Sequence, residues 1–160
     1  MFHKEKSVKA KKEHQCSCCY SQINKGDFYM RMEFVDLGKM NTWKLCFCCE
    51  KARQDLIESL KNDYLEIEYS LDNIDDFRIK KGNKVEFINE ENRKEYIDDI
   101  WHSVGIENEK FYTVREVELV DFNPLNVAGL GAMLSWVAFL EDSKKNQFDV
   151  PLYTVRKYFD

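Results

Sequence analysis

Six cysteines are the residues of this 160-residue chain with the clearest capacity for chemistry. They fall into two clusters, Cys16-Ser17-Cys18-Cys19 and Cys46-Phe47-Cys48-Cys49, and each cluster contains a C-x-x-C pair. A C-x-x-C turn aims two thiolates at one point, while neighbouring backbone N–H groups point at the sulfur atoms. Two such turns supply the four soft ligands of a tetrahedral zinc ion. The spacing therefore predicts one structural zinc ion, with redox chemistry or another metal as the alternatives; the predicted ligands are Cys16, Cys19, Cys46 and Cys49.

Two further cysteines and a histidine lie beside the predicted ligands. Cys18 and Cys48 are expected to be small side chains that fill or flank the two turns. Ligand exchange, a second metal and a redox switch with the adjacent cysteines are the alternatives for them. His14 precedes Cys16 by two residues, and we expect it to be a surface group or a neighbour of a ligand rather than a ligand itself.

The rest of the sequence is typical of a folded protein in a reducing compartment. Hydrophobic residues make up 44% of the chain, which is enough for a packed core and argues against intrinsic disorder. The N-terminus has no apolar stretch, so no signal peptide is expected. The longest uncharged run, residues 122–140, is short of the roughly 20 apolar residues that a spanning helix needs. We therefore expect a soluble, cytoplasmic protein, in which paired cysteines favour metal over disulfides.

The sequence between and after the two cysteine clusters predicts the elements that position the thiols. Residues 28–35 are rich in aromatic and branched side chains and predict a strand, residues 36–39 a turn, and residues 41–45 the returning strand of a hairpin. After Phe47, an uninterrupted helical pattern places apolar side chains at helical spacing; these are Ala52, Leu56, Ile57 and Leu60.

These residues resemble a known class of zinc finger. His14 to Asp27 reads HQCSCCYSQINKGD, with an isoleucine four residues after Cys19 and Gly-Asp seven and eight residues after it. A hairpin, Trp43 and a C-x-x-C pair that opens a helix follow. This order resembles the treble-clef zinc fingers, especially those of small phage and bacterial proteins, over residues 10–56. Tyr20 stands where that family usually has glycine, and Cys46 where it often has histidine. The resemblance implies a fold and a metal but no reaction.

The remaining sequence predicts a mixed α/β body. Strands are expected at residues 65–71 and 112–122, and a hairpin joins residues 77–79 to residues 85–88. Asn89 can cap a helix over residues 90–104 whose apolar stripe is Ile97, Ile100, Trp101 and Val104, and Gly105 ends it. A mostly apolar helix is expected from Pro124 to about Lys144, buried within the chain or, alternatively, against a partner. A short element over residues 150–159 is expected to be helical.

Charge divides the chain into a basic N-terminal part and an acidic remainder. Residues 1–53 carry 11 Lys/Arg and 6 Asp/Glu, a net charge of +5, whereas residues 54–160 carry −10. Five lysines form an N-terminal arm that is either solvated or in contact with phosphates: Lys4, Lys6, Lys9, Lys11 and Lys12. The residues predicted to contact a nucleic acid, if the protein binds one, are Lys9, Lys11, Lys12, Arg31 and Lys44.

A polar stripe in the body is the main candidate for chemistry outside the cysteines. At helical spacing, Glu91, Glu95, Asp98 and His102 share one face, which is either solvated, a docking face or a divalent-metal site. Nucleophile elbows, phosphate-binding glycine loops, dinucleotide fingerprints and H-E-x-x-H motifs are absent from the sequence. These observations favour a non-catalytic protein, with an enzyme of unrecognised type in the acidic part as one alternative.

Together these observations predict an α+β fold with two domains. Residues 1–62 form the basic arm and treble-clef finger, and residues 63–160 an acidic α/β domain with a buried C-terminal helix. The expected function is a zinc-stabilised binding protein of phage or mobile-element type, monomeric, that docks on a macromolecule, more readily a protein than a nucleic acid. The narrowest expectation is an inhibitor of a host defence system, such as an anti-CRISPR protein; a nucleic-acid-binding regulator is the other alternative.

Overall fold

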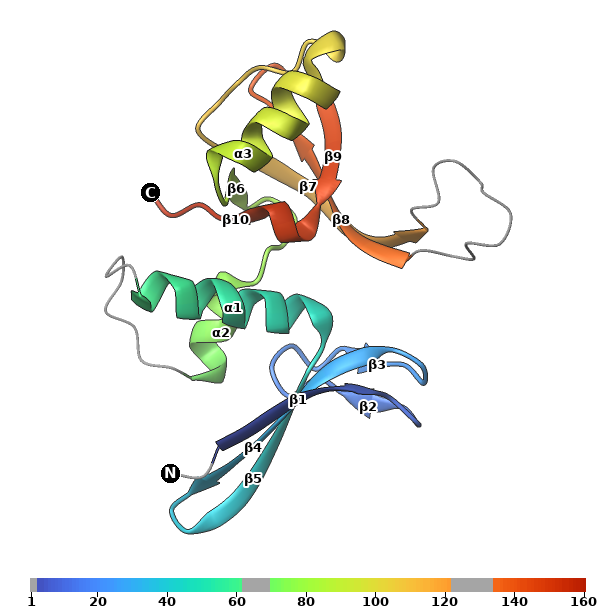
Figure 1. Ribbon diagram of the computed structural model, residues 1–160, viewed down its shortest axis with the longest axis vertical. Coiled ribbons are helices and arrows are strands. Elements are labelled where there is room, and N and C mark those ends of the chain that lie inside the picture. Colours follow the sequence, from blue (N-terminus) through green and yellow to red (C-terminus); the bar gives the residue numbers. More distant parts are fainter. Residues whose placement is uncertain (1–2, 62–69, 122–133) are drawn as a thin grey trace. The chain divides into compact units, whose positions relative to one another are not determined.

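The fold consists of two compact units. The computed structural model describes residues 3–61, 70–121 and 134–160 (Figure 1). Its units are Met1–Arg78 and Ile79–Asp160. The sequence placed the division after residue 62, whereas the structure assigns the helix before Arg78 to the first unit.

The first unit contains a three-stranded antiparallel sheet, a small two-stranded sheet and two helices. The larger sheet has the order β1-β4-β5, and the smaller one pairs β2 with β3. The elements are β1 (His3–Lys9), β2 (His14–Gln15), β3 (Gln22–Ile23), β4 (Phe28–Asp36), β5 (Lys39–Leu45), α1 (Phe47–Lys61) and α2 (Leu71–Phe77).

Strands β4 and β5 form the predicted hairpin, and the lysine-rich arm becomes part of the same sheet. The hairpin turn places Leu37 and Gly38 at φ of 47° and 76°, a left-handed pair that tight two-residue turns require. The arm up to Lys9 lies in strand β1, which pairs with β4 along its whole length, from His3 opposite Phe34 to Lys9 opposite Phe28. The lysines of β1 therefore have fixed positions relative to the hairpin.

Helix α1 packs its predicted apolar face into the core of the first unit. Cys49, Ala52 and Leu56 recur at i, i+3 and i+7 and are buried, as helical spacing requires. Arg53 is also buried, at 4% exposure, and pairs with Glu50 of the same helix and with Glu5 of β1. This ion pair joins the helix to the first strand.

Helix α2 belongs to the same core, which is why the unit extends to Arg78. Ser70 caps the helix by accepting a hydrogen bond from the Asn73 N–H. Ile74 and Phe77 are buried in one cluster with Leu56 of α1. The predicted strand over residues 65–71 lies mostly outside the described residues, and Leu71 is helical rather than extended.

The second unit is a five-stranded antiparallel sheet of order β10-β6-β7-β8-β9. Its strands are β6 (Lys84–Phe87), β7 (Tyr112–Asp121), β8 (Leu134–Glu141), β9 (Gln147–Pro151) and β10 (Val155–Lys157). Its helical segments are α3 (Glu90–Arg93), a π-helical continuation (Lys94–Ile100), and 3-10 turns at His102–Val104 and Leu152–Thr154.

Tyr112 lies at the centre of this second core. Its ring makes edge contacts with Phe87 and Phe148, at centroid distances of 6.0 and 5.0 Å. Its hydroxyl donates to the Glu107 carbonyl oxygen at 2.8 Å and accepts from the Glu109 N–H at 3.0 Å. The buried tyrosine thus has the polar partners that its hydroxyl needs.

The predicted buried C-terminal helix is wrong where the structure describes it. Residues 134–141 form strand β8, between β7 and β9, and residues 122–133 lie outside the described part of the chain. Val137, Ala138 and Leu140 are fully buried, whereas Trp136 is only partly buried. A strand that is covered on both faces has the continuous apolar sequence that was interpreted as a buried helix.

Two other predictions for the second unit are corrected by its sheet. The C-terminal residues expected to be helical form β9, a 3-10 turn and β10, and Pro151 lies opposite Val137 at the end of a ladder. The residues 77–79 expected to be a strand include the last residue of α2, and β6 pairs with β7 and β10 instead. The intervening turn is correct, since Asn83 donates its backbone N–H to the Lys80 carbonyl oxygen and Gly82 has φ of 86°.

The helix predicted over residues 90–104 is present with a different winding. Asn89 caps it by accepting from the Asn92 N–H, and Gly105 ends it at φ of 73°. Its central part is π-helical, which rotates the predicted apolar stripe. As a result Ile97 is buried, whereas Ile100 and Val104 are about half exposed. None of the helices in the described ranges is long and apolar enough to span a membrane.

Candidate metal centre

The first pair of ligand cysteines lies in a tight turn at the tip of the β2–β3 hairpin. The Cys16 N–H donates to the Ser21 carbonyl oxygen at 2.9 Å, and the Tyr20 N–H donates to the Cys16 carbonyl oxygen at 3.1 Å. Tyr20 has φ of 61°, in the left-handed region, and its side chain is 70% exposed. This backbone geometry explains why glycine is usual at this position in the fingers that the sequence resembles. Tyrosine adopts it here with its ring in solvent.

The second pair is set by the start of helix α1. Cys46 precedes the helix and Cys49 lies in its first turn, where the Glu50 N–H donates to the Cys46 carbonyl oxygen at 2.9 Å. Two hydrogen bonds fix the first turn against strand β5: the Ser17 N–H donates to the Lys44 carbonyl oxygen at 2.7 Å, and the Lys44 N–H donates to Ser17 Oγ at 2.9 Å. These hydrogen bonds thus help to bring the two cysteine pairs together, independently of any bond to a metal.

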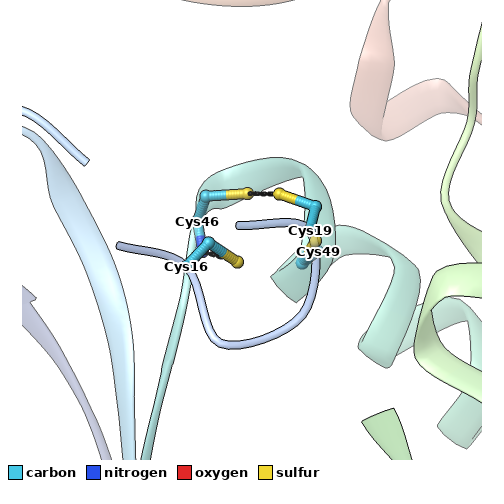
Figure 2. A group of neighbouring side chains, drawn as sticks. All are labelled: Cys16, Cys19, Cys46 and Cys49. Atoms are coloured by element: carbon cyan, nitrogen blue, oxygen red, sulfur yellow. Dashed lines mark hydrogen bonds between the residues drawn. The ribbon is translucent and has the colours of Figure 1, made fainter. Parts of the chain in front are cut away.

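The four thiols form one compact group, as Figure 2 shows. The sulfur atoms of Cys16, Cys19, Cys46 and Cys49 all lie within 4.8 Å of one another. Cys19 Sγ and Cys46 Sγ are 3.6 Å apart. A tetrahedral ion with metal–sulfur distances of about 2.3 Å requires sulfur–sulfur separations of about 3.8 Å. The sulfur positions and the donor type therefore fit one tetrahedral metal ion, and zinc is the ion that such a set suits best.

Backbone and side-chain donors support the thiolates of this group. The Cys46 N–H donates to Cys16 Sγ at 3.3 Å, and the Ser21 hydroxyl lies 2.9 Å from Cys19 Sγ. Such contacts around the ligands orient them and stabilise the charge on sulfur. Ser17 and Ser21 were not predicted from the sequence to support the site. Only their positions next to the cysteines could have suggested them.

Three of the four thiols share hydrogen bonds that shift their pKa values in opposite directions. Hydrogen bonds from the Cys46 and Cys49 thiols lower the pKa of the Cys16 thiol well below its usual range. The same hydrogen bonds to Cys16 raise the pKa of Cys46 to about 12 and raise that of Cys49. One thiolate is thus stabilised at the expense of its neighbours as long as protons occupy the site. A divalent metal replaces those protons and allows all four sulfurs to be charged.

The structure places Cys18 and Cys48 outside the four-sulfur group. Cys18 Sγ donates to the Leu71 carbonyl oxygen of α2 at 3.5 Å. Burial raises the pKa of the Cys18 thiol, and burial raises the pKa of Cys48 to about 11. Both are therefore protonated thiols near neutral pH, and Cys18 contributes to the contact between the first turn and α2.

His14 also lies outside the sulfur group, on the sheet side of the first turn. Its ring contacts Tyr29 of β4 at a centroid distance of 5.2 Å, and its Nδ1 is 3.1 Å from the Lys44 ammonium nitrogen. Burial, followed by the charges of Lys44, Lys12 and Arg31, lowers the pKa of the His14 imidazole. The histidine therefore marks a place where several cations converge.

The residues singled out for nucleic-acid contact are only partly brought together. Arg31 and Lys44 are direct partners across β4 and β5, and Lys12 acts on the same histidine. Lys9 lies at the end of β1 with its ammonium 5.9 Å from the Phe28 ring centroid. Lys11 is exposed in the bend after β1.

The polar stripe of the second unit does not form a metal site. Glu91, Glu95, Asp98 and His102 are all exposed, and the π-helical turns disturb the spacing that would align them. Within the described ranges, the four cysteines are the one group of potential metal ligands that comes together. A cavity of about 390 Å³ in the second unit is lined by other residues, among them Glu109, Phe111 and Glu141.

Comparison with known proteins gives no relative for this chain: no protein-family description, no curated protein and no solved structure matches it significantly. The class of site is therefore defined by its own geometry. It is a cluster of four cysteines that could hold a metal ion, in an α+β protein.

Proposed function

We propose that the first unit is a treble-clef zinc finger and that the protein is a non-catalytic binding protein stabilised by this zinc. The order of elements supports the proposal: a cysteine turn, the β4–β5 hairpin, and a helix whose first turn carries the second cysteine pair. The observation that carries it is the closed set of four sulfurs. Catalytic zinc sites keep one position for water or substrate, whereas four cysteine ligands fill the tetrahedron.

The role of the metal in this proposal is to hold the fold together. Cys16 and Cys19 fix the β2–β3 hairpin, and Cys46 and Cys49 fix the junction of β5 with α1. Zinc bound by these four thiolates contributes folding free energy and supplies no reaction. The surface that the finger displays, rather than the metal, then makes contact with a macromolecule in the cytoplasm.

Inhibition of a host defence system, of the anti-CRISPR kind, remains the narrowest version of this proposal. It requires a protein partner, and the small size and the acidic remainder of the chain support it. The alternative of a nucleic-acid-binding protein is favoured by Lys6, Arg31 and Lys44, which lie opposite one another on the sheet of the first unit. The exposed, separated positions of Glu91, Asp98 and His102 do not favour an enzyme in the second unit.

Metal analysis of the purified protein tests the proposal. We expect one zinc per chain, with metal–sulfur distances of about 2.3 Å by X-ray absorption. Cys46→Ala should lose the metal, whereas Cys18→Ser and Cys48→Ser, which change thiols outside the group, should retain it. Retention of zinc by Cys46→Ala, or its loss from both serine variants, would show that other sulfurs bind the metal.

A further inference from the structure

Three cations form a row across the three-stranded sheet of the first unit. In the strand register, Lys6 of β1 lies opposite Arg31 of β4, and Arg31 lies opposite Lys44 of β5. Residues directly opposite in antiparallel strands project from the same face, and neighbouring strands are about 4.8 Å apart. The three side chains therefore project from one face at regular spacing over about 10 Å.

This face is the one that α1 does not cover. The opposite face carries Glu5, Met32 and Trp43, which are register partners of one another, and Glu5 reaches the buried Arg53 of α1. On the face of the row, Tyr29 is covered by His14. Lys6 is exposed, and Arg31 and Lys44 are partly exposed. The row therefore lies beside the β2–β3 hairpin and is accessible to solvent.

The charges of the row are poorly compensated within the described residues. Like charges directly opposite each other on a sheet destabilise it, and this row contains two such pairs in succession. Arg31 pairs with Glu33, but the structure shows no carboxylate partner for Lys6 or Lys44 among residues 3–61 and 70–78. Arg31 Nε is also buried without a hydrogen-bond acceptor. An anion bound on this face would neutralise the charges of Lys6 and Lys44.

Lys12 and His14 extend the row towards the metal centre. The His14 ring is hydrogen-bonded to the Lys44 ammonium, and Lys12 is close enough to act on the same ring. The backbone of Lys44 is in turn fixed to Ser17 inside the first cysteine turn. The position of the row therefore depends on the folded finger.

We propose that Lys6, Arg31 and Lys44, with Lys12 beside them, form a binding face for the phosphodiester backbone of a nucleic acid. A row of evenly spaced cations fits the regular charge of a nucleic-acid strand better than the irregular carboxylates of a protein surface. Arg31 contributes a planar fork for phosphate oxygens, and the two lysines contribute point charges. On this face, no exposed aromatic ring occurs among the described residues, so the contact is with phosphates rather than by base stacking and is independent of sequence.

The inference rests on the proposed function, because the finger must be folded for the row to exist. The test is fluorescence anisotropy with labelled 20-nucleotide single-stranded and duplex DNA of mixed sequence, using zinc-loaded full-length protein over a range of salt concentrations. The test variant is Lys6→Gln/Arg31→Gln/Lys44→Gln. For single strands, we expect this variant to raise the Kd at least tenfold and to reduce the slope of log K against log salt by about 2, since three phosphate contacts are removed.

A control with the same change in net charge separates the row from general electrostatics. Lys39→Gln/Lys61→Gln/Lys81→Gln removes three exposed lysines that lie outside the row and should leave the slope close to that of the wild-type protein. No binding by the wild-type protein at 50 mM salt, or equal loss in the two triple variants, would overturn the inference. If zinc content is intact in those samples, the proposed zinc-stabilised fold stands while the nucleic-acid face fails.

Two further measurements sharpen the test. Glu33→Gln removes the carboxylate that occupies Arg31 and should tighten DNA binding two- to threefold, which a loss of fold cannot imitate. Polyglutamate of matched charge serves as the competing class of polyanion. If it binds the row as tightly as DNA does, an acidic protein is the partner and the nucleic-acid assignment is wrong.

Discussion

The two units of this protein have small cores that differ in composition. The core of the first unit includes two cysteines, Cys16 and Cys49, and a buried arginine that is paired with glutamates. The core of the second unit is made of aliphatic and aromatic side chains around Tyr112, and no cysteine occurs after Cys49 in the sequence. On the proposed function, we therefore expect the first unit to depend on a metal for stability and the second on apolar burial and hydrogen bonds.

Removal of the metal should produce the largest difference in stability between the two units. A high-affinity chelator should unfold the first unit, because zinc bound to four thiolates contributes on the order of 10 kcal/mol to folding in small fingers. Amide spectra should lose dispersion for residues 3–61 and keep it for residues 79–121 and 134–160. Re-addition of zinc should restore the lost signals.

Two outcomes would contradict this expected difference between the units. Dispersed signals from the first unit without metal would mean that its apolar core is sufficient. Loss of both units at one chelator concentration would mean that they fold as one cooperative body.

Asp142 provides the corresponding test for the second unit. Its carboxylate is 3% exposed and accepts hydrogen bonds at 2.9 to 3.1 Å from the Asn146 side chain and three backbone N–H groups, those of Glu107, Lys144 and Asn146. Burial alone would raise the pKa of Asp142, but these hydrogen bonds outweigh it, and the pKa is lowered. The stabilising contribution is therefore present above the unfolded-state pKa of about 3.9 and is lost as the pH falls through the lower folded-state pKa.

The expected effect of Asp142→Asn is a loss of about 1–3 kcal/mol of unfolding free energy at pH 7, because a buried acceptor is weakened. The variant should also lose less stability than the wild-type protein when the pH is lowered from 5 to 2. Urea unfolding at several pH values measures both quantities. Asp98→Asn, an exposed carboxylate on the π-helical segment, is the matched control and should change stability by less than about 0.5 kcal/mol. Equal effects of the two substitutions would contradict this role for Asp142.

The smallest effect is expected at the ion pair between β1 and α1. Glu5→Gln removes one partner of Arg53 at 2.9 Å, but Arg53 keeps Glu50 at 2.7 Å. Because Glu5 is 42% exposed and screened by solvent, we expect a loss of about 0.5–1 kcal/mol in urea unfolding of the zinc-loaded protein. The loss should shrink in 1 M salt. Glu13→Gln, at an exposed position after β1, should have no measurable effect on stability. A larger loss of stability for Glu13→Gln than for Glu5→Gln would contradict this role for the Glu5–Arg53 ion pair.

The cysteine turns, the β4–β5 hairpin and helix α1 of the first unit could be predicted from sequence because their constraints are local. The C-x-x-C spacing identifies a turn, Asp36 to Lys39 identify a hairpin, and the helical pattern after Phe47 has no breaker. Each of these features involves residues a few positions apart. The row of Lys6, Arg31 and Lys44 could not be predicted, because it depends on the register of β1 against β4.

The second unit was harder to predict because strand β8 has consecutive buried residues and the helix after Asn89 is wound irregularly. Consecutive burial of Val137 and Ala138 removes the alternation that distinguishes a strand from a buried helix. The caps of the helix after Asn89 were predictable from residue type, but its π-helical winding leaves no comparable pattern in sequence. Which strands pair with β6 depends on contacts between distant residues, such as Val155 with Phe87.

The distance along the chain between the two cysteine pairs has a consequence for how the protein is made. Cys49 follows Cys19 by 30 residues. Ribosomes add roughly 5–20 residues per second, so the first pair leaves the ribosome about 2–6 s before the second. During that interval the nascent chain offers only the three thiols of the first cluster, Cys16, Cys18 and Cys19, and two of them can oxidise to a disulfide or bind a metal weakly. The yield of correctly loaded protein should therefore depend on free zinc and on the thiol poise of the cell at the time of translation.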